Sequence, residues 1–120
     1  MKKEHPMTNI EVVSELNKII SFIDIASQDF REYLNSGNKS YWSTYFCNIF
    51  KTGVYLFDLR NNSSIDTTSQ IAIINNQITL YGDYTPTKRD NQERVLSLIF
   101  NIKKDLLKII KSIPLESDCP

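Results

Sequence analysis

Two helix-start signals lie near the two ends of the chain, and they constrain its fold more than any other feature. In Thr8–Glu11 and in Asp90–Glu93, a short oxygen-bearing side chain is followed three residues later by a glutamate. This is the capping-box pattern, in which the two side chains satisfy backbone N–H groups that the first turn of a helix leaves without partners. The sequence therefore predicts one long helix near each end of the chain.

The first of these helices is expected to span residues 8–36, with Gly37 as its left-handed cap residue. Apolar residues recur along it at steps of four and three, as they do on one face of a helix. They are Val12, Leu16, Ile19, Ile23, Ala26, Phe30 and Tyr33. Phe22 and Ile25 lie off this face, and Ile25 stands opposite Leu16 at about 100° per residue. We therefore take Phe22 and Ile25 as candidates for a partner-binding surface, with coincidence or burial by the β-hairpin described below as the alternative.

A second helix is expected to begin after Asn38 or Ser40, either of which can act as its N-cap. Whether it continues through residues 54–59 depends on Gly53, since glycine inside a helix costs about 1 kcal/mol relative to alanine. The alternative ends the helix near residue 52 and makes 54–59 an edge strand, as its β-favouring residues permit. We favour the continuous helix.

Residues 70–82 carry a β-like pattern. Two runs rich in β-branched residues, Gln70–Ile74 and Gln77–Tyr81, flank Asn75-Asn76. Asparagine tolerates the positive φ of a type I′ turn, so this pattern predicts an antiparallel hairpin. One edge of that hairpin would be free to pair with a partner strand.

The last helix is expected to span residues 90–113 and to end before Pro114. The predicted fold class is thus mainly α, formally α+β: three long helices packed as a bundle, with a small β-hairpin inserted between the second and the third. A single domain covers residues 8–113. A flexible N-terminal tail (1–7) and a C-terminal tail (114–120) flank it.

Composition disfavours several classes of function. Lys plus Arg and Asp plus Glu each number 14, so the formal net charge is zero, whereas nucleic-acid and membrane-surface binders usually carry a basic excess. No apolar run is long enough to span a membrane, and no signal peptide precedes Thr8. The two cysteines, Cys47 and Cys119, are then best explained as free thiols in a cytoplasmic protein.

The sequence contains no catalytic signature. The single histidine, His5, lies in a polar tail, and neither a zinc-ligand spacing nor a glycine-rich phosphate loop occurs. We therefore expect no enzymatic activity, no cofactor and no metal. Asp58, Asp66 and Asp83 could converge where helix, loop and hairpin meet, although solvated loop carboxylates are the simpler interpretation.

Seven aromatic residues fall between positions 41 and 57. Most of them fit the core face of the second helix, namely Trp42, Phe46, Phe50 and Phe57. Tyr41 and Tyr55 lie off that face, and we expect them to be available for contact with a partner.

These features favour a non-catalytic, soluble protein-binding domain. The best-fitting class is a small immunity protein, antitoxin or inhibitor that occludes a toxin or effector, with self-association as a dimer as another possibility. Abundant Ile and Asn with scarce Gly and Ala suggest AT-rich coding, and hence a bacterial or phage origin. One alternative is a nucleic-acid-associated regulator that uses a basic helix face, formed by Lys103, Lys104, Lys108 and Lys111. Another is a small-ligand carrier with a pocket among the aromatic residues.

Overall fold

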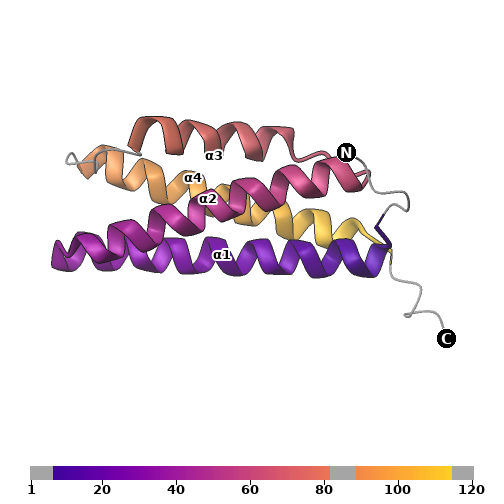
Figure 1. The fold of residues 1–120 in the computed structure, drawn as a ribbon, viewed down its shortest axis with the longest axis horizontal. Coiled ribbons are helices and arrows are strands. Elements are labelled where there is room, and N and C mark those ends of the chain that lie inside the picture. Colours follow the sequence, from indigo (N-terminus) through magenta and orange to yellow (C-terminus); the bar gives the residue numbers. More distant parts are fainter. Residues whose placement is uncertain (1–6, 82–88, 115–120) are drawn as a thin grey trace.

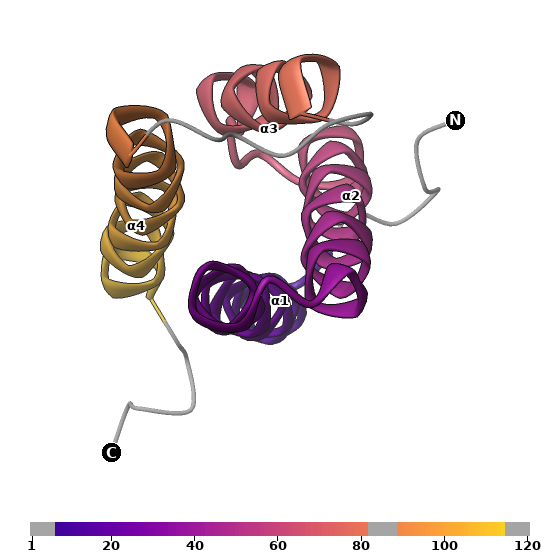
Figure 2. The same cartoon turned by 90° about the vertical axis from the view of Figure 1, so that its left-hand side faces the viewer.

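The computed structural model describes residues 7–81 and 89–114, and these residues form four helices without a strand (Figure 1). The helices are α1 (Asn9–Ser36), α2 (Lys39–Asn62), α3 (Thr68–Tyr81) and α4 (Arg89–Ser112). Seen along the bundle, they lie in chain order around a four-sided arrangement (Figure 2). The most extensive contact joins α1 to α2, while α3 packs on α2, and α4 packs on α1 and more lightly on α3.

The predicted boundaries of α1 are confirmed. Thr8 is its N-cap, and the reciprocal capping box with Glu11 is complete, with bonds of 3.2 and 2.9 Å. At the other end Gly37 has φ +71°, a left-handed conformation, and its N–H donates to the Tyr33 carbonyl over 2.7 Å. Only glycine adopts this conformation without steric cost, which explains why the helix ends here.

The α2 helix is continuous through Gly53, so the favoured interpretation is confirmed and the edge strand at 54–59 is wrong. The Asn38 side chain caps α2 by accepting from the Ser40 N–H over 2.9 Å. Gly53 allows a close approach to α3, because a Cβ at this position would lie 3.0 Å from Cγ2 of the buried Ile74. The packing of α3 against α2 thus offsets the free-energy cost of having glycine inside a helix.

The predicted hairpin at 70–82 is wrong, and α3 occupies residues 68–81 instead. Gln70 and Ile74 are spaced by one helical turn and both are buried, whereas Asn75 and Asn76, the expected turn, are exposed within the helix. The start of α3 is fixed by Thr67, whose hydroxyl donates to the Leu56 carbonyl of α2 over 2.8 Å and whose own carbonyl accepts from the Ile71 N–H. The two β-branched runs therefore form a helix rather than strands, because α2 presents a surface against which a helix can bury Ile74.

The described ends of the chain are held against the bundle. The Met7 N–H donates to the Asn62 carbonyl at the end of α2 over 3.2 Å, and the Asn9 side chain donates to the Pro114 carbonyl over 2.8 Å. The remainder of the two predicted tails, residues 1–6 and 115–120, lies outside the described residues. The side chain of Asp90, the predicted N-cap of the last helix, is also outside the described part. The α4 helix begins at Arg89, one residue before Asp90, so Asp90 lies within the helix.

Candidate protein-binding surface

The α2 stripe, which we define as Phe50, Val54 and Phe57, is an apolar line on the outer face of α2. These side chains remain 54%, 44% and 47% exposed. At 100° per residue they fall within a sector of about 60°, so they lie in a row over two turns. The prediction that Phe50 and Phe57 belong to the core is therefore wrong. The buried face of α2 is instead centred on Tyr45, Ile49, Thr52, Leu56 and Leu59.

A shallow groove runs beside the α2 stripe, between α2 and α3. Its volume is about 230 Å³, and it is lined by the stripe together with Gly53, Ile71 and Asn75. The missing side chain at Gly53 opens the floor of the groove, and Asn75 is its only polar side chain. A row of exposed apolar side chains beside a groove is a candidate site of interaction with another protein.

Two cations border this face of α2. The Arg60 guanidinium lies 5.1 Å from the centre of the Phe57 ring, and the Lys51 ammonium lies 5.8 Å from the Phe22 ring on α1. Both distances are within the range of cation–π attraction. The stripe thus has an apolar centre and a partly charged border, as the centre and rim of protein interfaces do.

The structure brings together two of the residues selected from the sequence, Phe22 and Tyr55. Their rings meet edge-to-face across α1 and α2 with centres 5.1 Å apart, and both side chains are half-buried. Each therefore serves as packing for the other within this chain. Ile25 is 46% exposed on α1, and Tyr41 is half-buried in the first turn of α2. Neither forms part of the α2 stripe.

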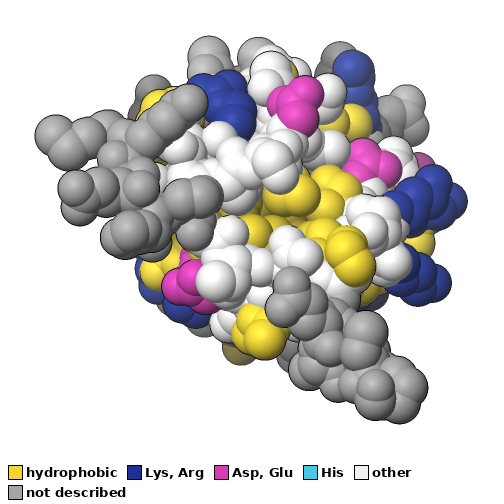
Figure 3. All heavy atoms as spheres, turned by 90° about the vertical axis from the view of Figure 1, so that its right-hand side faces the viewer, with side chains coloured by type: hydrophobic (Ala, Val, Ile, Leu, Met, Phe, Trp, Pro, Cys, Tyr) yellow, Lys and Arg dark blue, Asp and Glu magenta, His cyan; other side chains and the backbone are white. Residues whose placement is uncertain are grey.

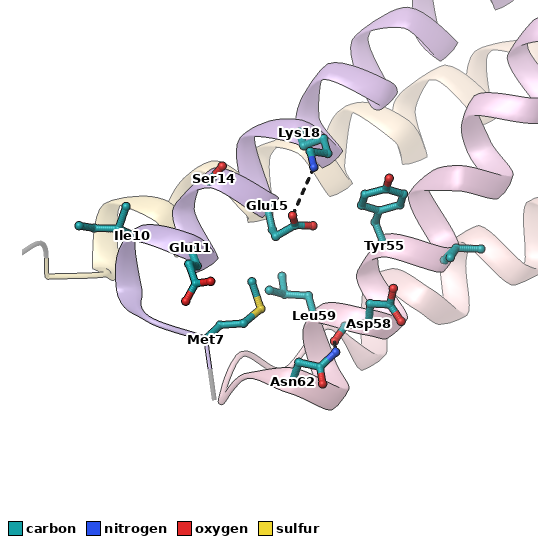
Figure 4. Close-up of a pocket in the computed structure, with 11 residues that line it drawn as sticks. Met7, Ile10, Glu11, Ser14, Glu15, Lys18, Tyr55, Asp58, Leu59 and Asn62 are labelled. Atoms are coloured by element: carbon teal, nitrogen blue, oxygen red, sulfur yellow. Dashed lines mark hydrogen bonds and ion pairs between the residues drawn. The ribbon is translucent and has the colours of Figure 1, made fainter. Parts of the chain in front are cut away.

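The expected convergence of three aspartates is not seen among the described residues, of which Asp83 is not one. Asp58 is exposed on α2 and borders a hollow of about 810 Å³ between α2 and the first half of α1 (Figure 4). The Glu15–Lys18 ion pair, 3.4 Å long, lies in the wall of this hollow (Figure 4). Asp66 lies apart from the hollow, in the connection between α2 and α3, and no cluster of three His, Cys, Asp or Glu side chains occurs in the described part.

Asp66 has a local structural role at the start of α3. Its carboxylate accepts from the Thr68 backbone N–H over 3.0 Å. The pKa of Asp66 lies below the ordinary value of 3.8 because the Thr68 hydroxyl, and then the Thr68 N–H, donate hydrogen bonds to the charged form. The low pKa thus reflects a helix-capping turn.

We expect Thr68→Val to raise the pKa of Asp66 toward 3.8, because valine keeps the shape of threonine and its N–H but loses the hydroxyl. A depressed pKa in the folded state contributes stability at pH values above the ordinary pKa, and this contribution is lost as the pH falls through the lower, folded-state pKa. The variant should therefore lose less stability on acidification. An NMR titration of the Asp66 carboxyl measures the shift directly. Thr68→Ser, which retains a hydroxyl, is the control, and an equal pKa in both variants would contradict the assignment.

The basic stripe predicted on α4 is divided in the structure. Lys103 forms an ion pair with Asp24 of α1 over 2.7 Å, so this cation is turned toward α1. Lys104, Lys108 and Lys111 are exposed. One of the four charges expected to act together is thus already neutralised within the chain.

A second apolar region lies at the end of the bundle where α1 begins and α2 and α4 end (Figure 3). Met7 precedes α1, Ile65 lies in the connection between α2 and α3, and Ile113 follows α4. All three are half-buried against the core. This second region is thus the part of the hydrophobic core that reaches the end of the bundle. The α2 stripe lies on the side of the bundle and is separate from it.

Comparison of the chain with protein-family models, with curated proteins and with solved structures yields no match. None of the helices, as far as their residues are described, has the length and apolar character that crossing a membrane requires.

Proposed function

We propose that this protein is a non-catalytic protein-binding domain that docks its partner through the α2 stripe. The observation that supports the proposal is the row of three large apolar side chains on α2, each about half exposed. Full burial of one such side chain contributes about 1.5–3 kcal/mol, and because each is already about half buried, covering the remainder contributes about half of this for each. A partner that covers the row recovers this free energy.

Within this proposal, the class of partner remains the one favoured by the composition: a toxin or effector bound by an immunity protein, antitoxin or inhibitor, or a second copy of the chain. The cytoplasmic location belongs to the same proposal and is supported by Cys47, whose thiol is exposed and forms no disulfide within the described part of the chain. No specific observation favours the regulator that binds nucleic acid, since Lys103 is paired with Asp24. The groove beside Phe50 and Phe57 is shallow and does not enclose a small ligand. The larger hollow beside Tyr55 is lined by charged and polar side chains as well as apolar ones.

The proposal predicts that the double variant Phe50→Gln/Phe57→Gln loses association while its fold persists. Both side chains are about half buried, so the double variant should lower the free energy of unfolding by about 1.5–3 kcal/mol and the domain should remain folded. Removal of two interface anchors should weaken partner binding by about 30-fold or more, as loss of a central apolar contact does. Cross-linking in the native cells followed by mass spectrometry, with the tagged wild type beside the variant, measures the loss.

The matched control is Phe100→Gln. Phe100 is 63% exposed, more than either phenylalanine of the α2 stripe, but it lies on α4. This variant should retain every associated protein that the wild type binds. Equal loss in both variants, or equal retention, would contradict the assignment of the binding surface to α2.

A further inference from the structure

We infer that the partner of the α2 stripe is a second copy of this chain, packed α2 against α2 in antiparallel orientation with a two-fold axis beside Val54. The inference rests on the proposed function, because it names the occupant of the same surface. It follows from the arrangement of charged and apolar side chains around Val54.

Four exposed side chains of α2 are placed symmetrically along the helix about Val54. Phe50 and Lys51 come four and three residues before it, and Phe57 and Asp58 come three and four residues after it. All four are exposed. Each half of this set therefore carries one aromatic ring and one charge, and the two charges have opposite sign. Arg60, whose guanidinium lies over the Phe57 ring, adds a further cation at the border of the half that follows Val54.

The aromatic rings and the charges lie on opposite sides of the helix. Phe50 and Phe57 line the groove that Ile71 of α3 borders, so they are on the α3 side. Lys51 reaches over Phe22 of α1, and Asp58 borders the hollow that α1 shares, so both are on the α1 side.

A two-fold axis that lies in the interface and is perpendicular to α2 makes the two copies of α2 antiparallel. It also places the α3 side of one copy against the α3 side of the other, and the α1 side against the α1 side. It places Phe50 opposite the second copy's Phe57, and Lys51 opposite the second copy's Asp58, each contact occurring twice. The two members of each pair are displaced along the helix axis by one residue, about 1.5 Å. The displacement of the aromatic pairs on the α3 side is opposite in direction to that of the charged pairs on the α1 side. This is the displacement expected when two helices cross at an inclined angle rather than run strictly parallel to each other.

A parallel dimer does not fit the same surface. An axis along the helix would exchange the two sides, so that Phe50 would face the second copy's Lys51 and Phe57 would face its Asp58. Lys51 would then gain only a cation–π contact, Asp58 would be desolvated against an aromatic ring, and neither would gain a charged partner. The antiparallel arrangement is therefore the one in which this surface complements itself, in apolar contact and in charge.

The groove over Gly53 fits the same arrangement. It lies on the α3 side, where the second copy's phenylalanine rings approach, and Gly53 has no side chain to obstruct them. One helix face per subunit is near or below the lower end of stable interface sizes, about 1,200 Å² in total. We therefore expect a dimer that dissociates on dilution, with a dissociation constant in the micromolar range.

Sedimentation equilibrium of the full chain tests the inference through a charge reversal and its restoration. Lys51→Glu and Asp58→Lys should each weaken the dimer by about tenfold, because each places two like-charge pairs across the interface. The double variant Lys51→Glu/Asp58→Lys should return the dissociation constant to near the wild-type value, since it exchanges the signs of both pairs. A double variant as weak as the single ones would overturn the antiparallel arrangement.

Disulfide trapping gives a second readout that does not depend on charge. Cys47 and Cys119 are replaced by serine, and Val54→Cys then places one thiol beside the two-fold axis in each subunit. Mild oxidation should convert most of this variant to a covalent dimer, because residues that meet at a two-fold axis come within disulfide distance. Ser97→Cys, at an exposed position of α4, is the matched control and should remain monomeric.

The outcomes separate this inference from the proposed function. A wild type that remains monomeric at about 100 µM, together with a foreign protein that Phe50→Gln/Phe57→Gln fails to bind, overturns the second copy and leaves the binding surface in place. A monomer whose associations do not depend on the α2 stripe overturns both. A dimer that Phe50→Gln/Phe57→Gln dissociates, and that Lys51→Glu/Asp58→Lys retains, supports both.

Discussion

Replacing Leu106 by alanine is expected to lower the free energy of unfolding by about 2–5 kcal/mol, because it removes a large side chain from the core and leaves a cavity. Leu106 lies on α4 with no exposed surface and belongs to the same buried cluster as Leu16, Ile99 and Ile102. Urea unfolding followed by circular dichroism at 222 nm measures the change. Because α4 packs on α1 and α3, the loss should be felt by the whole bundle in one cooperative transition.

The adjacent residue provides the control for this experiment. Leu107 is chemically identical to Leu106, yet 41% of its surface is exposed. Leu107→Ala should change the free energy of unfolding by only about 0.5 kcal/mol, as surface substitutions do. Equal effects at the two positions would mean that the buried face of α4 has been assigned incorrectly.

Replacing Gly53 by valine is expected to lower the free energy of unfolding by about 1–3 kcal/mol, the usual cost of overpacking. A Cβ alone would come within 3.0 Å of Ile74 Cγ2, and the two methyl groups of valine need still more space. Ile74 is fully buried and cannot move aside toward solvent. Thermal and urea unfolding of Gly53→Val against the wild type give the value.

A double-mutant cycle shows whether the strain arises at Ile74. In an Ile74→Ala background, Gly53→Val should be much less harmful, because the methyl group that it meets is gone. Ser43→Val, at an exposed position of the same helix, controls for valine in a helix and should have a small effect. Strict additivity of Gly53→Val and Ile74→Ala would contradict the packing of α3 on α2 at this point.

The α1 and α2 helices were predictable from the sequence because their ends are encoded locally. Thr8 and Glu11 form their hydrogen bonds within one turn, and the left-handed cap at Gly37 needs only a missing side chain. Asn38 likewise caps α2 through a bond to a residue two positions away. Interactions of this range do not depend on where the rest of the chain lies, and so a local pattern suffices to recognise them.

Residues 70–81 show the limit of such patterns. Their β-branched residues favour a strand locally. A short apolar run is compatible both with the repeat of a strand and with that of a helix. What decides the matter is the surface of α2, where the absence of a side chain at Gly53 admits Ile74 and the Leu56 carbonyl receives the Thr67 hydroxyl. Both contacts join residues more than ten positions apart in the sequence. Helix propensity and hydrophobic periodicity depend on neighbouring residues only, and so they do not detect such contacts.

The candidate binding surface was only partly predictable for the same reason. The sequence locates the aromatic residues on α2, but which of them are exposed depends on the rotation of this helix against α1 and α3. Tyr55, expected to be free, packs on Phe22, whereas Phe50 and Phe57, expected in the core, face outward. Composition, helix caps and helical periods are properties of the chain alone, and they determined the positions of α1, α2 and α4. The helical state of 68–81 and the exposed row on α2 were decided by tertiary packing, because burial is a relation between helices that no single helix specifies.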